Sequence, residues 1–113
     1  MRQAPDRLRD ILEAIGRIEK HALRGRETFD RDELLQTWIV HHLLIIGEAC
    51  RALPQLFREQ HPEVPWLEIV GMRNALVHHY FEIDRELVWE VVVRDLPRLR
   101  AAIEAILAEP GLQ

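Results

Sequence analysis

The sequence predicts an all-α protein, an antiparallel up-and-down bundle of four main helices with one additional short helix. Apolar residues recur at helical spacing through most of the chain, and with only 5 glycines and 6 prolines a many-turned β architecture is disfavoured. At 113 residues we expect one domain, residues 1–113, with a single core. Hydrophobic residues make up 48% of the chain and charged residues 30%, which is typical of folded globular proteins and argues against disorder.

The first two main helices are expected in the first half of the chain. The first runs from about Asp6 to His21 and has a charged exposed face. Asp30 and Glu33 form a capping-box pattern, which predicts the start of a long helix that ends near Leu53. Its expected buried stripe includes one histidine, which we interpret as a core residue: Leu35, Trp38, Ile39, His42, Ile45, Ile46, Ala49 and Leu53.

The second half begins with a short helical segment, residues 55–60, and a tight connection rich in proline. A third main helix opens at Pro65 and continues to about Tyr80. The last helix is expected to be capped by Asp84, and Pro97 should interrupt it near Val93, because an interior proline removes one backbone donor.

Arg73 occupies an unusual place in the third main helix. At about 100° per residue it falls in the middle of an apolar stripe formed by Trp66, Ile69, Val70, Leu76, Val77 and Tyr80. A guanidinium cannot lose its charge on burial, so it needs a carboxylate, carbonyl groups, water or a phosphate ligand. Asn74 and His78 flank the stripe. One interpretation is a structural ion pair; the other is an anion-binding site. Asp95 is a candidate partner for the ion pair, but its place near the Pro97 kink favours a solvated carboxylate.

The spacing of Arg73, His78 and Tyr80 is the R-x4-H-x-Y pattern, and the chain resembles the HepT branch of the HEPN superfamily. The same order of motifs is found in GEACRAL (47–53), HPEVPW (61–66), GMRNALVHHYF (71–81) and DLPRL (95–99). The resemblance covers roughly residues 8–107. It implies a HEPN-like helical bundle that works as a homodimer with the motif at the interface.

The resemblance also implies a function, that of a toxin in a type VII-like toxin-antitoxin system. Such toxins are paired with a minimal nucleotidyltransferase antitoxin, which attaches AMP to the tyrosine of the motif, here Tyr80. An AMP group would place a bulky anion about two turns from Arg73 and block the site. The chain has no nucleotidyltransferase signature of its own, so the modifying enzyme must be another protein.

The motif residues suit metal-independent cleavage of RNA. RNA carries its own nucleophile, the 2'-hydroxyl, so cleavage needs a base, an acid and charge stabilisation. His78 can transfer protons near neutral pH, and Arg73 can hold the scissile phosphate. Asn74 and Tyr80 are candidate substrate-binding residues. A dimer would bring two copies of Arg73 and His78 into one cleft.

Two other functions remain open. The chain can be a noncatalytic module that binds the nucleotidyltransferase or a nucleotide. A metal-dependent hydrolase using His41, His42, His78 and His79 is disfavoured, because adjacent histidines point to different sides of a helix. We therefore expect no metal ligand and no cofactor.

We expect a cytoplasmic protein, and no membrane span, because no run approaches the roughly 18 consecutive apolar residues that a span needs. The net charge of -4 argues against a broad basic face, so RNA contacts should be confined to a cleft. Cys50 is the single cysteine, which fits a reducing compartment, and we interpret it as a packing residue.

Overall fold

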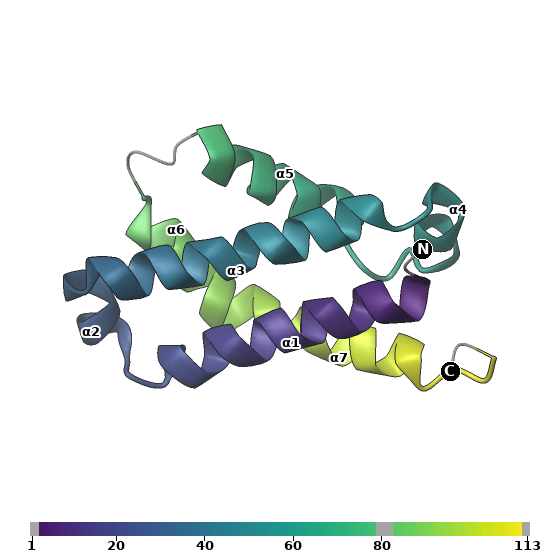
Figure 1. Cartoon of the computed structure of the whole chain (residues 1–113), viewed down its shortest axis with the longest axis horizontal. Helices are drawn as coiled ribbons and strands as arrows, with labels where there is room; N and C mark the ends of the chain where they lie inside the picture. The colour runs from purple at the N-terminus through teal and green to yellow at the C-terminus, as the bar shows by residue number, and fades with distance from the viewer. Residues whose placement is uncertain (1–2, 79–82, 112–113) are drawn as a thin grey trace.

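The computed structural model describes residues 3–78 and 83–111, and of Val77 and His78 it describes the backbone only. In this part of the chain every regular element is helical, which confirms the all-α prediction (Figure 1). The elements are α1 (Ala4–Ala22), α2 (Arg26–Arg31), α3 (Glu33–Ala52), α4 (Gln55–Gln60), α5 (Trp66–His78), α6 (Arg85–Glu90), the π-helical segment η1 (Val91–Asp95) and α7 (Leu96–Leu107).

The centre of the fold is the antiparallel pair α1 and α3. The apolar side chains of α1 face α3 and are fully buried at Leu8, Ile11, Ile15 and Ile18. Burying one such side chain stabilises the fold by about 1.5–3 kcal/mol. Helix α7 covers α1 from another side, where Arg100 forms an ion pair with Glu19.

The start of α3 differs from the prediction. Asp32, and not Asp30, is the N-cap, and its Oδ1 accepts a hydrogen bond from the backbone N–H of Leu35 at 3.1 Å. Asp30 belongs to the unpredicted short helix α2, which places the fully buried Phe29 in the core. The side chain of Gln36 donates a hydrogen bond to the Phe29 carbonyl at 2.8 Å, which ties α2 to α3 at this turn.

The buried stripe of α3 is also narrower on one side than predicted. Leu35, Ile39, Ile46, Ala49, Leu53 and His42 are buried, as expected. Trp38 and Ile45, by contrast, are 40% and 37% exposed, because they lie on the outer edge of the helix. Leu43 and Cys50 are buried instead, since α3 packs against two helices, α1 and α5.

The C-terminal helical run follows its two predicted signals. Asp84 caps α6 by accepting a hydrogen bond from the backbone N–H of Leu87 at 3.0 Å. The interruption predicted near Val93 takes the form of η1, which ends just before Pro97 in the first turn of α7. A wider π-helical turn tolerates the missing proline donor, because the backbone hydrogen bonds there already depart from the α pattern.

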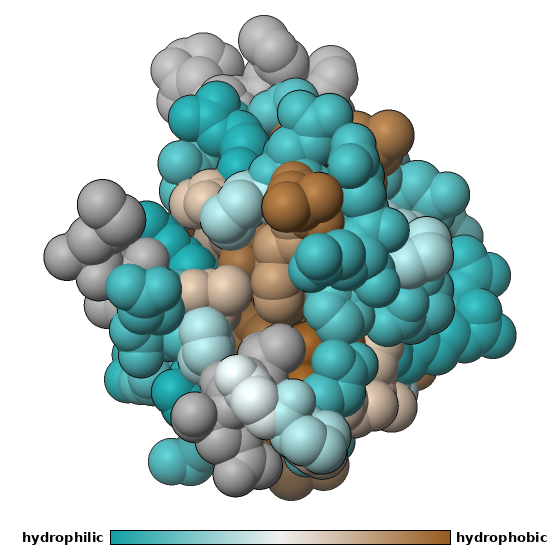
Figure 2. Space-filling view, turned by 90° about the vertical axis from the view of Figure 1, so that its right-hand side faces the viewer, coloured by the Kyte–Doolittle hydropathy of each residue, from teal (hydrophilic) through white to brown (hydrophobic). Residues whose placement is uncertain are grey.

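Helix α5 lies on the opposite side of α3 from α1 (Figure 1) and packs mainly on α3. A groove of about 740 Å³ separates it from η1 and α7. Figure 2, which looks at the end of the bundle that carries α4, shows a hydrophilic surface with a narrow hydrophobic band down its middle. No helix in the described part of the chain has the length and apolar character that crossing a membrane requires.

Candidate functional site

Arg73 lies where α5 and α3 come closest. A Cβ atom placed on Gly47 of α3 would lie 2.3 Å from the Cβ of Arg73 and 2.6 Å from its Cγ, far inside van der Waals contact. The glycine therefore lets the aliphatic stem of Arg73 lie directly on the α3 backbone. This placement confirms that Arg73 is on the packed face of α5. Its head group, however, is not buried, because the side chain is 28% exposed.

Two side chains hold the guanidinium of Arg73. Its Nη2 lies 3.3 Å from Oε2 of Glu48, the residue that follows Gly47 on α3. Its Nη1 donates a hydrogen bond to Oδ1 of Asn74 at 3.1 Å. The other oxygen of Glu48, Oε1, lies 3.6 Å from Nη2 of Arg51. Arg73 is thus oriented from both sides, by α3 and by its own helix.

The suggested pairing of Arg73 with Asp95 is wrong. Asp95 lines the groove between α5 and α7, and its carboxylate lies 3.6 Å from Nε of Arg94. Glu48 takes the place of Asp95 because α5 packs on α3, whereas the groove separates α5 from η1.

The Arg73–Glu48 pair is accessible to solvent. Glu48 is 50% exposed, and ion pairs of this kind contribute about 0–1 kcal/mol to stability. Two long polar side chains, held in place at the surface, can therefore exchange partners at little cost. An incoming phosphate can bind the guanidinium, which offers donors beyond the two already used.

The remaining motif residues lie at or beyond the end of α5. His78 is its last residue, so Arg73, Asn74 and His78 belong to one helix. Tyr80 and His79 lie outside the described residues. The roles predicted for His78 and Tyr80 remain predictions.

His42 is a core histidine, as predicted. It is 2% exposed, and its Nδ1 lies 2.8 Å from the carbonyl oxygen of Trp38, which fixes Nδ1 as the donor because a carbonyl only accepts. Within residues 3–78 and 83–111, no three His, Cys, Asp or Glu side chains are arranged to hold a metal ion. A metal centre built on His41 and His42 therefore gains no support from the described residues.

Cys50 is a buried packing residue. Burial raises the pKa of its thiol from 9.0 to about 12, partly offset by the positive charge of Arg58. The thiol is therefore neutral near pH 7 and is a poor nucleophile.

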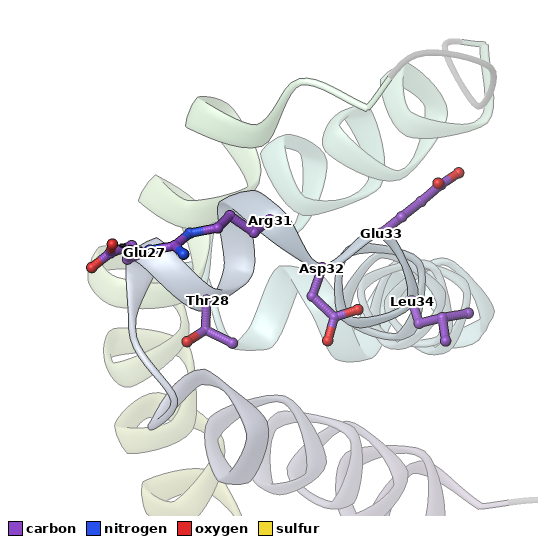
Figure 3. Close-up of a pocket in the computed structure, with 6 residues that line it drawn as sticks. All are labelled: Glu27, Thr28, Arg31, Asp32, Glu33 and Leu34. Carbon is purple, nitrogen blue, oxygen red and sulfur yellow. Dashed lines mark hydrogen bonds and ion pairs between the residues drawn. The ribbon is translucent and has the colours of Figure 1, made fainter.

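Two smaller hollows flank α3. One, of about 310 Å³, lies between α1 and α3 and includes Glu48 in its lining. The other, of about 520 Å³, lies at the junction of α2 and α3 (Figure 3). Its charges serve the fold: Asp32 caps α3, and Arg31 forms an ion pair with Glu27.

Gly47 and Glu48 are the site residues that sequence reasoning did not identify. The run from Gly47 to Leu53 carries a resemblance to the HepT branch, but that resemblance assigns no role to either residue. The available signal was a glycine in the interior of a long helix, which costs helix stability and therefore indicates close packing or a local function.

Comparisons with known proteins agree with the sequence motif. The family described as "Ribonuclease HepT-like" matches residues 11–106. "Probable ribonuclease HepT" of Thermococcus cleftensis is 39% identical over 106 residues, which cover 93% of this chain and 96% of that protein. "Putative RNase TTE0752" of Caldanaerobacter subterraneus subsp. tengcongensis is 43% identical over 81 residues, 72% of each chain.

A third similar protein is longer. "Gamma-glutamylcyclotransferase and putative RNase MJ0434" of Methanocaldococcus jannaschii is 39% identical over 103 residues, 90% of this chain but 46% of that protein. The region similar to this chain is thus about half of that protein. No solved structure shows significant similarity to the chain.

Proposed function

Because the chain belongs to the HepT-like ribonuclease family, we propose that it is a metal-independent endoribonuclease and the toxin of a toxin-antitoxin pair. The observation that carries this proposal is the accessible guanidinium of Arg73, anchored between Glu48 and Asn74 at the contact of α5 with α3. Arg73 binds the scissile phosphate and stabilises the charge that develops on its oxygens. His78 transfers a proton, and Asn74 orients the phosphate or Arg73.

The active form is a homodimer. Leu67 on α5, the helix that carries Arg73, is 81% exposed. Exposed apolar side chains around a polar site are typical of a surface that a second copy covers. A two-fold axis there brings two copies of Arg73 and His78 into one cleft.

A minimal nucleotidyltransferase antitoxin controls the toxin by attaching AMP to Tyr80. The resemblance to the family supports this part of the proposal, and so does the spacing of the motif, in which Tyr80 follows Arg73 by seven residues. An AMP phosphate near Arg73 would occupy the guanidinium that RNA needs. The protein acts in the cytoplasm, where RNA and the antitoxin are found.

Cleavage by purified variants tests the catalytic proposal. Arg73→Ala and His78→Ala should each lower the rate of RNA cleavage by at least about 10²-fold, with unchanged helicity and dimerisation. Arg9→Ala is the matched control, because Arg9 is an exposed α1 arginine that pairs with its neighbour Asp6. Full cleavage by the Arg73 variant would contradict the proposed mechanism.

Intact mass measurement tests the regulation. Expression with the neighbouring antitoxin gene should add one or more AMP units to the peptide that contains Tyr80. Tight complex formation without modification, together with no cleavage of any RNA, would instead indicate a noncatalytic binding module.

A further inference from the structure

We propose that the hollow between α1 and α3 holds the nucleoside on the 5' side of the cleaved phosphate, and that Glu48 at its edge is the general base. This inference rests on the proposed ribonuclease function and adds a subsite and a second proton-transfer group to it. Glu48 belongs to both features: it lines the hollow, and its Oε2 lies 3.3 Å from Nη2 of Arg73. A phosphate on Arg73 is therefore adjacent to whatever occupies the hollow.

The size and lining of the hollow suit one nucleoside. Its volume of about 310 Å³ lies at the lower end of the range for small-molecule sites, roughly 300–1,000 Å³, and excludes an RNA helix. Ala14, Ile45 and Ala49 give it an apolar surface for the faces of a base and ribose. The α1 side of the hollow is charged and consists of Arg7, Asp10, Glu13 and Arg17, of which Arg17 is paired with Glu13 at 2.6 Å. These groups, with the nearly buried ring of His42, offer donors and acceptors for base edges.

The two oxygens of Glu48 have different neighbours. Oε2 faces Arg73, whereas the contact of Oε1 with Arg51, at 3.6 Å, is longer than a hydrogen bond. Oε1 is therefore the oxygen that can accept a proton while Oε2 keeps Arg73 in place. Because the Glu48 side chain is half exposed, a ribose in the hollow can reach it.

Glu48, His78 and Arg73 supply every protein group that the cleavage step needs. The 2'-oxygen attacks phosphorus as its proton passes to Oε1 of Glu48, and the bond between phosphorus and the 5'-oxygen breaks. The leaving 5'-oxygen takes a proton from protonated His78. The products are a 2',3'-cyclic phosphate and a 5'-hydroxyl, and Arg73 stabilises the phosphorane charge. With Glu48, a single chain carries both proton-transfer groups.

Kinetics of Glu48→Gln test the base. The amide keeps the size and an acceptor oxygen but removes basicity, so kcat should fall about 10²–10³-fold. KM should stay equal or decrease, since a negative charge beside the phosphate is lost. The low-pH limb of the kcat/KM profile should flatten, and Glu48→Asp should recover part of the rate. A merely structural role would leave the pH profile unchanged.

Glu33→Gln is the matched control, an exposed glutamate in the first turn of the same helix. Glu48→Gln with kcat within about threefold of wild type and an intact low-pH limb would overturn the base assignment. If Arg73→Ala were inactive in the same assay, the ribonuclease proposal would survive that result. Wild-type protein that cleaves no RNA would instead overturn both.

Nucleotide binding tests the hollow without any cleavage. Titration with uridine and adenosine 3'-monophosphates should shift the backbone amide NMR signals of Ala14, Ile45 and Ala49. Ile45→Trp, which fills the hollow, should weaken binding at least fivefold, whereas Leu34→Trp, on the same edge of α3 and outside it, should not. Shifts confined to other surfaces, or equal binding by both tryptophan variants, would overturn the subsite.

Discussion

The inner pair of helices, α1 and α3, and the outer helix α5 are built in different ways. Four side chains of α1 are completely buried, whereas the described side chains of α5 that are buried are only those of Trp66 and Leu76. Helix α5 is held instead by specific contacts, such as the indole N–H of Trp66, which donates to the carbonyl of His61 at 2.9 Å. The functional motif therefore lies on a helix that contributes much less to the core than α1, which leaves its polar side chains accessible.

Truncating one apolar side chain in each region should give the largest difference in the free energy of unfolding. Ile15→Ala in α1 should lower the free energy of unfolding by about 2–5 kcal/mol, because it leaves a cavity in the core. At protein concentrations low enough for the chain to be monomeric, Leu67→Ala in α5 should change it by no more than about 0.5 kcal/mol, since Leu67 is exposed in the single chain. Urea unfolding followed by circular dichroism measures both. Similar effects of the two substitutions would contradict the comparison.

The contact between the two regions can be tested with two glycines. Gly47→Ala should destabilise the protein by about 1–3 kcal/mol, because the new Cβ would collide with Arg73 and push the helices apart. Gly71→Ala in α5 meets open space, so it should stabilise the protein by about 0.5–1 kcal/mol through helix propensity. Thermal unfolding should show changes of opposite sign. A stabilised Gly47→Ala variant would show that the helices are not in close contact.

Cys50 lies one turn from Gly47 on α3, and the pKa of its thiol reports whether water reaches that side of the core. Its pKa is about 12 in the folded chain against an ordinary value of 9.0, so between these pH values only the unfolded chain loses the proton. The free energy of unfolding should then fall by up to about 1.4 kcal/mol per pH unit in this range. Denaturation of wild type and Cys50→Ala at several alkaline pH values should show a shallower fall in the variant. Identical slopes would mean that the thiol is hydrated.

The smallest effect on stability is expected at the Arg73–Glu48 pair. A double-mutant cycle with Arg73→Ala and Glu48→Ala should give a coupling free energy below about 1 kcal/mol, because both side chains reach solvent. A coupling well above this value would favour the structural ion pair over the anion-binding site.

The sequence predicted the features that depend on local patterns. Helical periodicity located the main helices, Asp84 marked the start of α6, and Pro97 marked the interruption at η1. The ordered motifs around Arg73 led to the correct family, and the periodicity of α5 placed Arg73 on the packed face.

Features that depend on tertiary neighbours were not predictable in the same way. Trp38 and Ile45 have the spacing of core residues, yet they stay partly exposed because α1 covers that edge of α3 incompletely: the Trp38 ring meets His21 of α1 edge-on, and Ile45 lines the hollow between the two helices. The partner of Arg73 depends on which helix packs on α5. The helical periodicity of α5 alone cannot distinguish Glu48 on α3 from Asp95 in η1. Helix α2 was missed because its main support is the burial of a single residue, Phe29.

The arginines of this chain are largely engaged with carboxylates of the same surface. Pairs one turn apart, such as Arg17 with Glu13 and Arg94 with Glu90, recur along α1 and the C-terminal run. Each such pair places a carboxylate beside a guanidinium, so the described surface has little net positive charge, and binding of RNA should release only one or two counterions for each chain. The affinity for RNA should therefore change little with salt concentration, and recognition should depend on a short stretch of nucleotides at Arg73.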